Sequence, residues 1–126
     1  MTKAGPVRLL IVDDSASTRR LIKTLVTTLG PCSACELYEC ADGSEPMDAY
    51  RLRQPDFVLM DIQMRTMDGI TATARLKAAD PSAKIVMVTN YDQVDLREAA
   101  LEAGAYAFVS KDDLLQLVHL LEREQL

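Results

Sequence analysis

The sequence predicts an α/β fold in which helices cover both faces of a parallel β-sheet. Short apolar runs alternate with helical patterns along the whole chain, and the connections between them are short. The strand candidates are apolar nearly throughout, whereas a sheet with one wet face would alternate apolar and polar residues. These observations favour strands that are buried on both sides.

The apolar runs predict the strands Arg8–Asp13, Glu36–Ala41, Phe57–Asp61, Lys84–Thr89 and Ala107–Ser110. Right-handed crossovers leave few ways to connect five such strands through helices. The doubly wound, flavodoxin-like sheet with strand order 2-1-3-4-5 and five helices is the commonest of these arrangements.

Helical periodicity and end signals predict the five helices. The first, Ser15–Leu29, ends at a Gly-Pro pair and places one apolar face over Leu21, Ile22, Leu25, Val26 and Leu29. The second begins near Ser44, with Pro46 in its first turn, and the third runs from Gly69 through Ala79. The fourth is capped by Asp92 and runs to Ala103, and the last is capped by Asp112 or Asp113.

The last helix carries more leucine than one buried face requires. Its core stripe is expected at Leu114, Leu117, Val118 and Leu121, with Leu115 and Leu120 beside it. Either some apolar surface is left for a partner, or the helix packs ordinarily with one or two exposed leucines.

Length and charge limit the classes of protein. The 126 residues suffice for a single domain, expected over 1–126 with its core at about 7–122. The net charge of −5 gives no general attraction for nucleic acid. We expect neither a membrane span nor a signal peptide, and a cytoplasmic location.

Three cysteines lie close together at Cys32, Cys35 and Cys40, and an odd number favours a reducing compartment. A redox Cys-X-X-Cys motif needs its first cysteine at a helix N-terminus. Here the motif follows a helix and precedes a strand, so we interpret these cysteines as small residues of a turn and a strand.

Polar residues gather where four predicted strands end. Asp13 and Asp14, Asp61, Thr89 and Lys111 each follow an apolar run. Taken singly, each is more often a cap, a turn residue or a solvated side chain. Taken together they meet at the carboxyl edge of one sheet, where doubly wound folds bind ligands.

That set of groups suits phosphoryl transfer. Clustered carboxylates repel one another unless a cation intervenes, and an all-oxygen site favours Mg²⁺. A carboxylate can act as the nucleophile, while a lysine and a hydroxyl neutralise and bind the phosphoryl oxygens.

The sequence resembles a response-regulator receiver domain of two-component signalling from about Arg8 to about Leu121. The resemblance is carried by the strand-end residues above and by three short segments: Ala41-Asp42-Gly43, Met67-Asp68-Gly69, and Gly104-Ala105 leading to Phe108-Val109-Ser110-Lys111. Together these motifs are highly specific.

The resemblance implies a role for each matched position. Asp61 would accept a phosphoryl group from a histidine kinase or a phosphotransfer protein. Mg²⁺ would be held by Asp61, by Asp14 directly, by Asp13 mainly through water, and by the backbone carbonyl of Gln63. Thr89 and Lys111 would bind phosphoryl oxygens, Phe108 would be the switch aromatic, and the face of the fourth helix, fifth strand and fifth helix would meet an output domain or a second copy.

Some positions depart from the family pattern. Arg65 replaces the usual proline after Met64, and Asn90 replaces the usual small residue after the switch threonine. These departures keep open a receiver-like adaptor that no longer takes phosphate. A magnesium phosphohydrolase of the haloacid-dehalogenase type is a further alternative, but its second aspartate is replaced by Gln63. A receiver of this kind is not expected to be a conventional enzyme.

Overall fold

A computed structural model of the chain describes residues 6–29, 35–41, 46–65, 68–90 and 93–125. Within these residues a five-stranded parallel sheet has the order β2-β1-β3-β4-β5, which confirms the predicted topology. The strands are β1 (Arg8–Val12), β2 (Glu36–Cys40), β3 (Phe57–Met60), β4 (Ile85–Thr89) and β5 (Ala107–Ser110).

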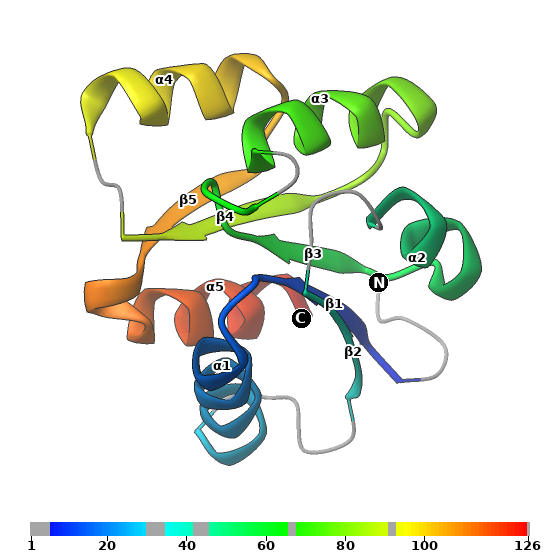
Figure 1. Cartoon of the computed structure of the whole chain (residues 1–126). Coiled ribbons are helices and arrows are strands. Elements are labelled where there is room, and N and C mark those ends of the chain that lie inside the picture. Colours follow the sequence, from blue (N-terminus) through cyan, green and yellow to red (C-terminus); the bar gives the residue numbers. More distant parts are fainter. Residues whose placement is uncertain (1–5, 30–34, 42–45, 66–67, 91–92, 126) are drawn as a thin grey trace.

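Helices cover both faces of the sheet, as Figure 1 shows. On one face lie α1 (Ala16–Thr28) and α5 (Leu115–Gln125), and on the other lie α2 (Pro46–Arg53), α3 (Gly69–Ala79) and α4 (Val94–Glu102). Each face has its own apolar core: Ile22, Val26 and Leu117 pack on the first, while Leu76 and Ala100 pack on the second. The central strands are therefore apolar on both sides.

Several helix starts differ from the sequence prediction. The predicted cap Asp92 and the predicted start Ser44 lie outside the described residues; α4 begins at Val94, with Gln93 at the cap position and no side-chain cap bond. The predicted caps Asp112 and Asp113 are wrong. They lie in a short 3₁₀ turn, Lys111–Asp113, in which Ser110 accepts a hydrogen bond from the Asp112 N–H. A serine just before a turn competes effectively for such donors.

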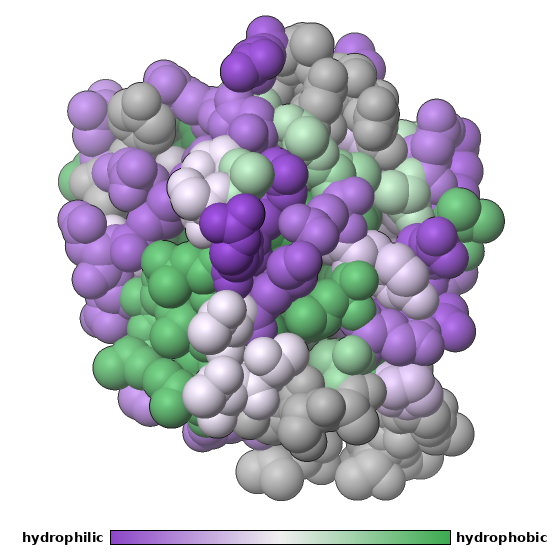
Figure 2. Space-filling model, turned by 60° about the horizontal axis from the view of Figure 1, so that its bottom comes forward, coloured by the Kyte–Doolittle hydropathy of each residue, from purple (hydrophilic) through white to green (hydrophobic). Residues whose placement is uncertain are grey.

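The apolar residues of the last and the first helix are distributed differently between core and surface. Leu115 of α5 is about half exposed, whereas Leu120 of α5 and Leu114, which directly precedes the helix, are buried. This is the ordinary packing that the sequence left open, with one exposed leucine. In α1 the predicted five-residue face was too wide, because Leu21 and Leu29 are exposed. Figure 2 shows hydrophobic patches that are separated by hydrophilic side chains on the face that it presents.

Two further findings concern the cysteines and membranes. Cys35 is disulfide-bonded, which differs from the expectation of reduced cysteines, and Cys40 is a buried free thiol. Among the helices of the described residues, none combines the length and the apolar character that crossing a membrane would require.

A buried tyrosine connects two helices on the α2–α3–α4 face. Tyr50 of α2 donates a 2.6 Å hydrogen bond to Asp80, which also accepts from the N–H and hydroxyl of Ser82 in the turn after α3. Burial, followed by the bond to Asp80 and its charge, raises the pKa of Tyr50 well above its usual value. The folded state therefore favours the neutral phenol.

We expect Tyr50→Phe to lower the free energy of unfolding by about 1 kcal/mol at neutral pH, because one hydrogen bond is lost. Since the pKa is raised in the fold, wild-type stability falls as the pH rises above the ordinary tyrosine value of 10.0. The variant should lose less stability over that alkaline range in denaturant titrations. Tyr38→Phe, which removes a hydroxyl from a half-buried side chain, is the control; equal alkaline slopes in wild type and Tyr50→Phe would contradict the prediction.

Candidate functional site

The strand register brings two aspartates together at the carboxyl edge of the sheet. Val12 and Met60 are paired across β1 and β3, and Asp13 and Asp61 follow them directly. The Asp13 N–H donates to the Cys40 carbonyl at 3.0 Å, and the Asp61 N–H donates to the Val12 carbonyl at 2.9 Å. The main chain of each aspartate is thus hydrogen-bonded to a neighbouring strand at the residue whose side chain points into the site.

Three carboxylates form one cluster at this edge. An oxygen from each of Asp13, Asp14 and Asp61 lies within 4.8 Å of the others. Asp13 and Asp61 are only 2% and 7% exposed, whereas Asp14 is exposed. Such a cluster of like charges is unfavourable without nearby positive charge.

Lys111 supplies part of that charge. Its ammonium lies 2.8 Å from Asp13 Oδ2 and 3.1 Å from Asp61 Oδ2, so it bridges the two buried carboxylates. Burial alone would lower the pKa of Lys111, but the hydrogen bond to Asp13 and the charges of both aspartates outweigh it. The pKa therefore lies above its ordinary value, and the side chain is a cation.

The remaining oxygens of the buried carboxylates are held by the main chain. Asp61 Oδ1 accepts a 2.8 Å hydrogen bond from the Ile62 N–H, and Asp13 Oδ1 accepts one of 2.8 Å from the Ser15 N–H. Each side chain therefore has one anchored oxygen and one that faces Lys111. This arrangement fixes the rotamers and directs one oxygen of Asp61 toward the cation.

The other predicted residues occupy neighbouring positions. Thr89, fully buried, ends β4 and is paired in register with Ser110, which precedes Lys111. Phe108 is paired with Met87 and packs in the same core cluster, and the Arg97 guanidinium lies 5.0 Å from the centroid of its ring. Gln63 is exposed on the connection after Asp61.

Two contributors to the geometry were not predicted. Gly69 lies so close to Asp61 that an added Cβ would come within 1.9 Å of the Asp61 carbonyl oxygen. Arg19 donates a 2.6 Å hydrogen bond from Nη1 to the Asp13 carbonyl. Gly69 had a signal, because it belongs to the Met67-Asp68-Gly69 motif and begins the predicted third helix, although its close approach to Asp61 was not foreseen. The contact of Arg19 depends on the packing of α1, which the sequence pattern leaves open.

The donor set fits a hard divalent cation. Its atoms are carboxylate oxygens, which Mg²⁺ prefers over nitrogen or sulfur. The three negative charges exceed the single positive charge of Lys111, so net negative charge is left for a metal ion. Asp14, exposed beside two buried carboxylates, gives that ion access from solvent.

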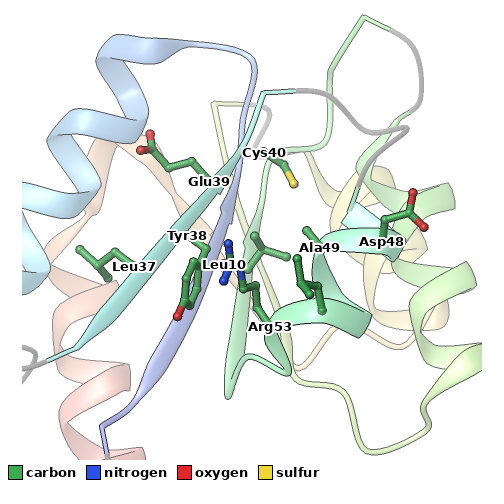
Figure 3. Close-up of a pocket in the computed structure, with 9 residues that line it drawn as sticks. Leu10, Leu37, Tyr38, Glu39, Cys40, Asp48, Ala49 and Arg53 are labelled. Carbon is green, nitrogen blue, oxygen red and sulfur yellow. The ribbon is translucent and has the colours of Figure 1, made fainter.

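A hollow lies between β2 and α2 (Figure 3). Its volume is about 720 Å³, and Tyr38, Cys40, Ala49, Leu52 and Arg53 are among the residues that line it. The Arg53 guanidinium, which is one of these lining groups, lies 4.5 Å from the centroid of the Tyr38 ring.

The fold and the acidic edge define the class of doubly wound α/β domains that bind ligands at the carboxyl ends of their strands. The chain matches the model of the response regulator receiver domain over residues 9–122 and belongs to that family. Receiver domains of this family act in two-component signalling, where phosphorylation and Mg²⁺ are typical, and are signalling domains rather than conventional enzymes.

Individual relatives agree with this assignment. The chain is 38% identical to the chemotaxis protein CheY of Bacillus subtilis over 104 residues, covering 82% of this chain and 84% of that protein. It is 28% identical to a chain in the CheX–CheY–BeF₃–Mg²⁺ complex from Borrelia burgdorferi, with a TM-score of 0.81 and coverage of 92% and 89%. A LuxR-family response regulator from Aurantimonas is also 28% identical, with a TM-score of 0.83 and coverage of 96% and 88%.

Proposed function

We propose that the chain is a phosphorylatable receiver, one domain over 1–126 with its core at about 7–122, in which Asp61 is the phosphoacceptor. The observation that carries this proposal is the way in which the two oxygens of the Asp61 carboxylate are held. Its Oδ1 is anchored by the Ile62 N–H, and its Oδ2 faces the Lys111 ammonium at 3.1 Å. A carboxylate held in this way is positioned for attack on a phosphorus atom.

In the proposed reaction a carboxylate oxygen of Asp61 attacks the phosphorus of a kinase phosphohistidine. The new O–P bond forms as the P–N bond breaks, and the imidazole leaves with its electron pair and takes up a proton. Lys111 and Thr89 bind the phosphoryl oxygens. Mg²⁺, when held by Asp13, Asp14, Asp61 and the Gln63 carbonyl, supplies charge neutralisation around those oxygens.

The proposed output lies on the face of α4, β5 and α5. Phe108 shares a face of the sheet with the end of β4, so a movement of Thr89 toward a phosphoryl group changes the space beside its ring. We propose that Phe108 then moves inward and that this face binds a partner, an output domain or a second copy. The similarity to both CheY and a LuxR-family regulator supports either arrangement.

Intact-protein mass spectrometry after incubation with acetyl phosphate tests the proposal. We expect the wild type to gain one phosphoryl group only when Mg²⁺ is present, and Asp61→Asn to gain none. Asp48→Asn, which removes an exposed carboxylate from α2, is the matched control and should be phosphorylated normally. A wild type that gains no mass would favour the adaptor alternative, and phosphorylation of Asp61→Asn would identify a different acceptor.

The exposed Asn90, directly after Thr89, is expected to slow access to Asp61. Asn90→Ala should therefore raise the rate at which the phosphorylated form decays about threefold, which corresponds to a barrier lowered by about 0.7 kcal/mol. Decay can be followed by loss of the phosphoryl mass after the donor is removed. Gln93→Ala, at an exposed position beside α4, should decay like the wild type; unchanged decay in Asn90→Ala would contradict the prediction.

A further inference from the structure

The side chain of Arg19 connects α1, β2 and the connection that carries the acidic pair. Its Nη1 donates to the backbone carbonyl of Asp13 at 2.6 Å, and its Nε donates to Glu39 Oε1 at 2.9 Å. The side chain is only 16% exposed although it is charged. A guanidinium presents several donors in a rigid plane, so one Arg19 side chain satisfies both acceptors at once.

Glu39 holds this guanidinium from the far side. It belongs to β2, and Figure 3 shows its carboxylate turned away from the hollow and toward α1. Its second oxygen accepts a hydrogen bond from Lys23 at 2.9 Å. The bonds from Lys23 and Arg19 hold the pKa of Glu39 below its ordinary value, so it remains an anion.

The main chain at Asp13 is consequently fixed on both sides. Its N–H is bonded to the Cys40 carbonyl of β2, and its carbonyl is bonded to Arg19. The Asp13 carbonyl and the Asp14 N–H belong to one planar peptide group. Fixing the carbonyl therefore fixes the direction in which the backbone presents Asp14, whose own side chain is exposed.

We propose that Arg19, anchored by Glu39, is a positioning residue that orients the Asp13–Asp14 pair for a divalent cation. The inference rests on the proposed function of the acidic cluster and assigns one residue to its geometry. Arg19 acts on a cation in two opposite ways. Its positive charge repels the cation, whereas its hydrogen bond holds the peptide in the orientation that binds it, and the sign of a mutational effect shows which dominates.

Binding of Mg²⁺ alone, followed by amide NMR shifts, separates these effects. We expect Arg19→Ala to weaken Mg²⁺ binding by about tenfold, as losses of groups that orient metal ligands do. Arg20→Ala is the matched control: it removes the same charge from the next, exposed position of α1 and should leave affinity unchanged or slightly tighter. Glu39→Gln keeps Arg19 but weakens its anchor, and it should weaken binding in the same direction.

A second readout distinguishes positioning from general damage. The Mg²⁺ concentration for half-maximal phosphorylation by acetyl phosphate should rise in Arg19→Ala, while the rate at saturating Mg²⁺ stays close to wild type. The inference would be overturned if Arg19→Ala bound Mg²⁺ as tightly as the wild type, or more tightly. If Arg19→Ala does not fold, wild-type Mg²⁺ affinity in Glu39→Gln would overturn it instead. Failure of the wild type to bind Mg²⁺ would instead overturn the proposed function.

Discussion

Lys111→Met is expected to lower the free energy of unfolding by about 3 kcal/mol in the presence of a chelator, because it leaves two buried carboxylates without their cation. In the wild type the ammonium lies within 3.1 Å of both Asp13 and Asp61, and all three side chains are at most 12% exposed. Methionine preserves most of the side-chain volume. The expected loss is therefore electrostatic, and denaturant titration at neutral pH measures it.

Added Mg²⁺ should stabilise the Lys111→Met variant more than the wild type, since the metal ion then replaces the missing ammonium between the carboxylates. Lys84→Met is the matched control. Lys84 is exposed, and its ammonium lies over the Phe57 and Tyr106 rings rather than near the acidic edge. Its replacement should cost less than about 1 kcal/mol. Equal Mg²⁺ stabilisation in Lys111→Met and wild type would contradict the electrostatic explanation.

The pH dependence of this difference has a definite sign. The pKa of Lys111 is raised above its ordinary value of 10.5 in the folded state. Its contribution is therefore fully present below that value and is lost as the pH rises through the folded-state pKa. The difference in stability between wild type and Lys111→Met should stay constant near neutrality and shrink only in strongly alkaline solution.

The sequence alone predicted the sheet because its signals are local and consistent. Apolar runs such as Phe57–Met60, separated by capped helices, leave little choice of topology once crossovers are right-handed. The parallel order of the strands also placed Asp13 and Asp61 at one edge, because residues that directly follow two paired parallel strands lie at the same end of the sheet. The sheet topology and the common edge of these two aspartates depend on hydrophobic periodicity and on the order of the elements, and both can be read directly from the sequence.

The remaining features depend on distances that sequence patterns do not record. The sequence placed Lys111 at the same sheet edge as Asp13 and Asp61, but its close contacts with both carboxylates follow from the side-chain packing. Asp112 and Asp113 do not cap α5 because a 3₁₀ turn capped by Ser110 comes first, and propensity alone cannot rank Ser110 against two aspartates that follow within three residues. The exposure of Leu21 similarly reflects how α1 is rotated on the sheet.

Gly69→Ala is expected to destabilise the fold by about 3 kcal/mol and to slow phosphorylation of Asp61. A Cβ at this position would lie 1.9 Å from the Asp61 carbonyl oxygen and 2.8 Å from its carbonyl carbon. Both contacts are with main-chain atoms, so no rotamer change relieves them. The start of α3, where the Gly69 N–H donates to the Ile62 carbonyl at 2.6 Å, must therefore move away from Asp61.

Gly104→Ala separates this local effect from loss of stability in general. Gly104 has a φ of +106°, so alanine is strained there, and its nearest neighbours are atoms of the flexible Lys77 side chain. It precedes β5 and therefore lies at the opposite edge of the sheet from Asp61. We expect Gly104→Ala to lose about 1–2 kcal/mol of stability yet to take phosphate from acetyl phosphate at the wild-type rate while folded. Only Gly69→Ala displaces the main chain beside the phosphoacceptor. Equal phosphorylation rates in folded Gly69→Ala and Gly104→Ala would therefore show that close packing against Asp61 is not needed to present its carboxylate.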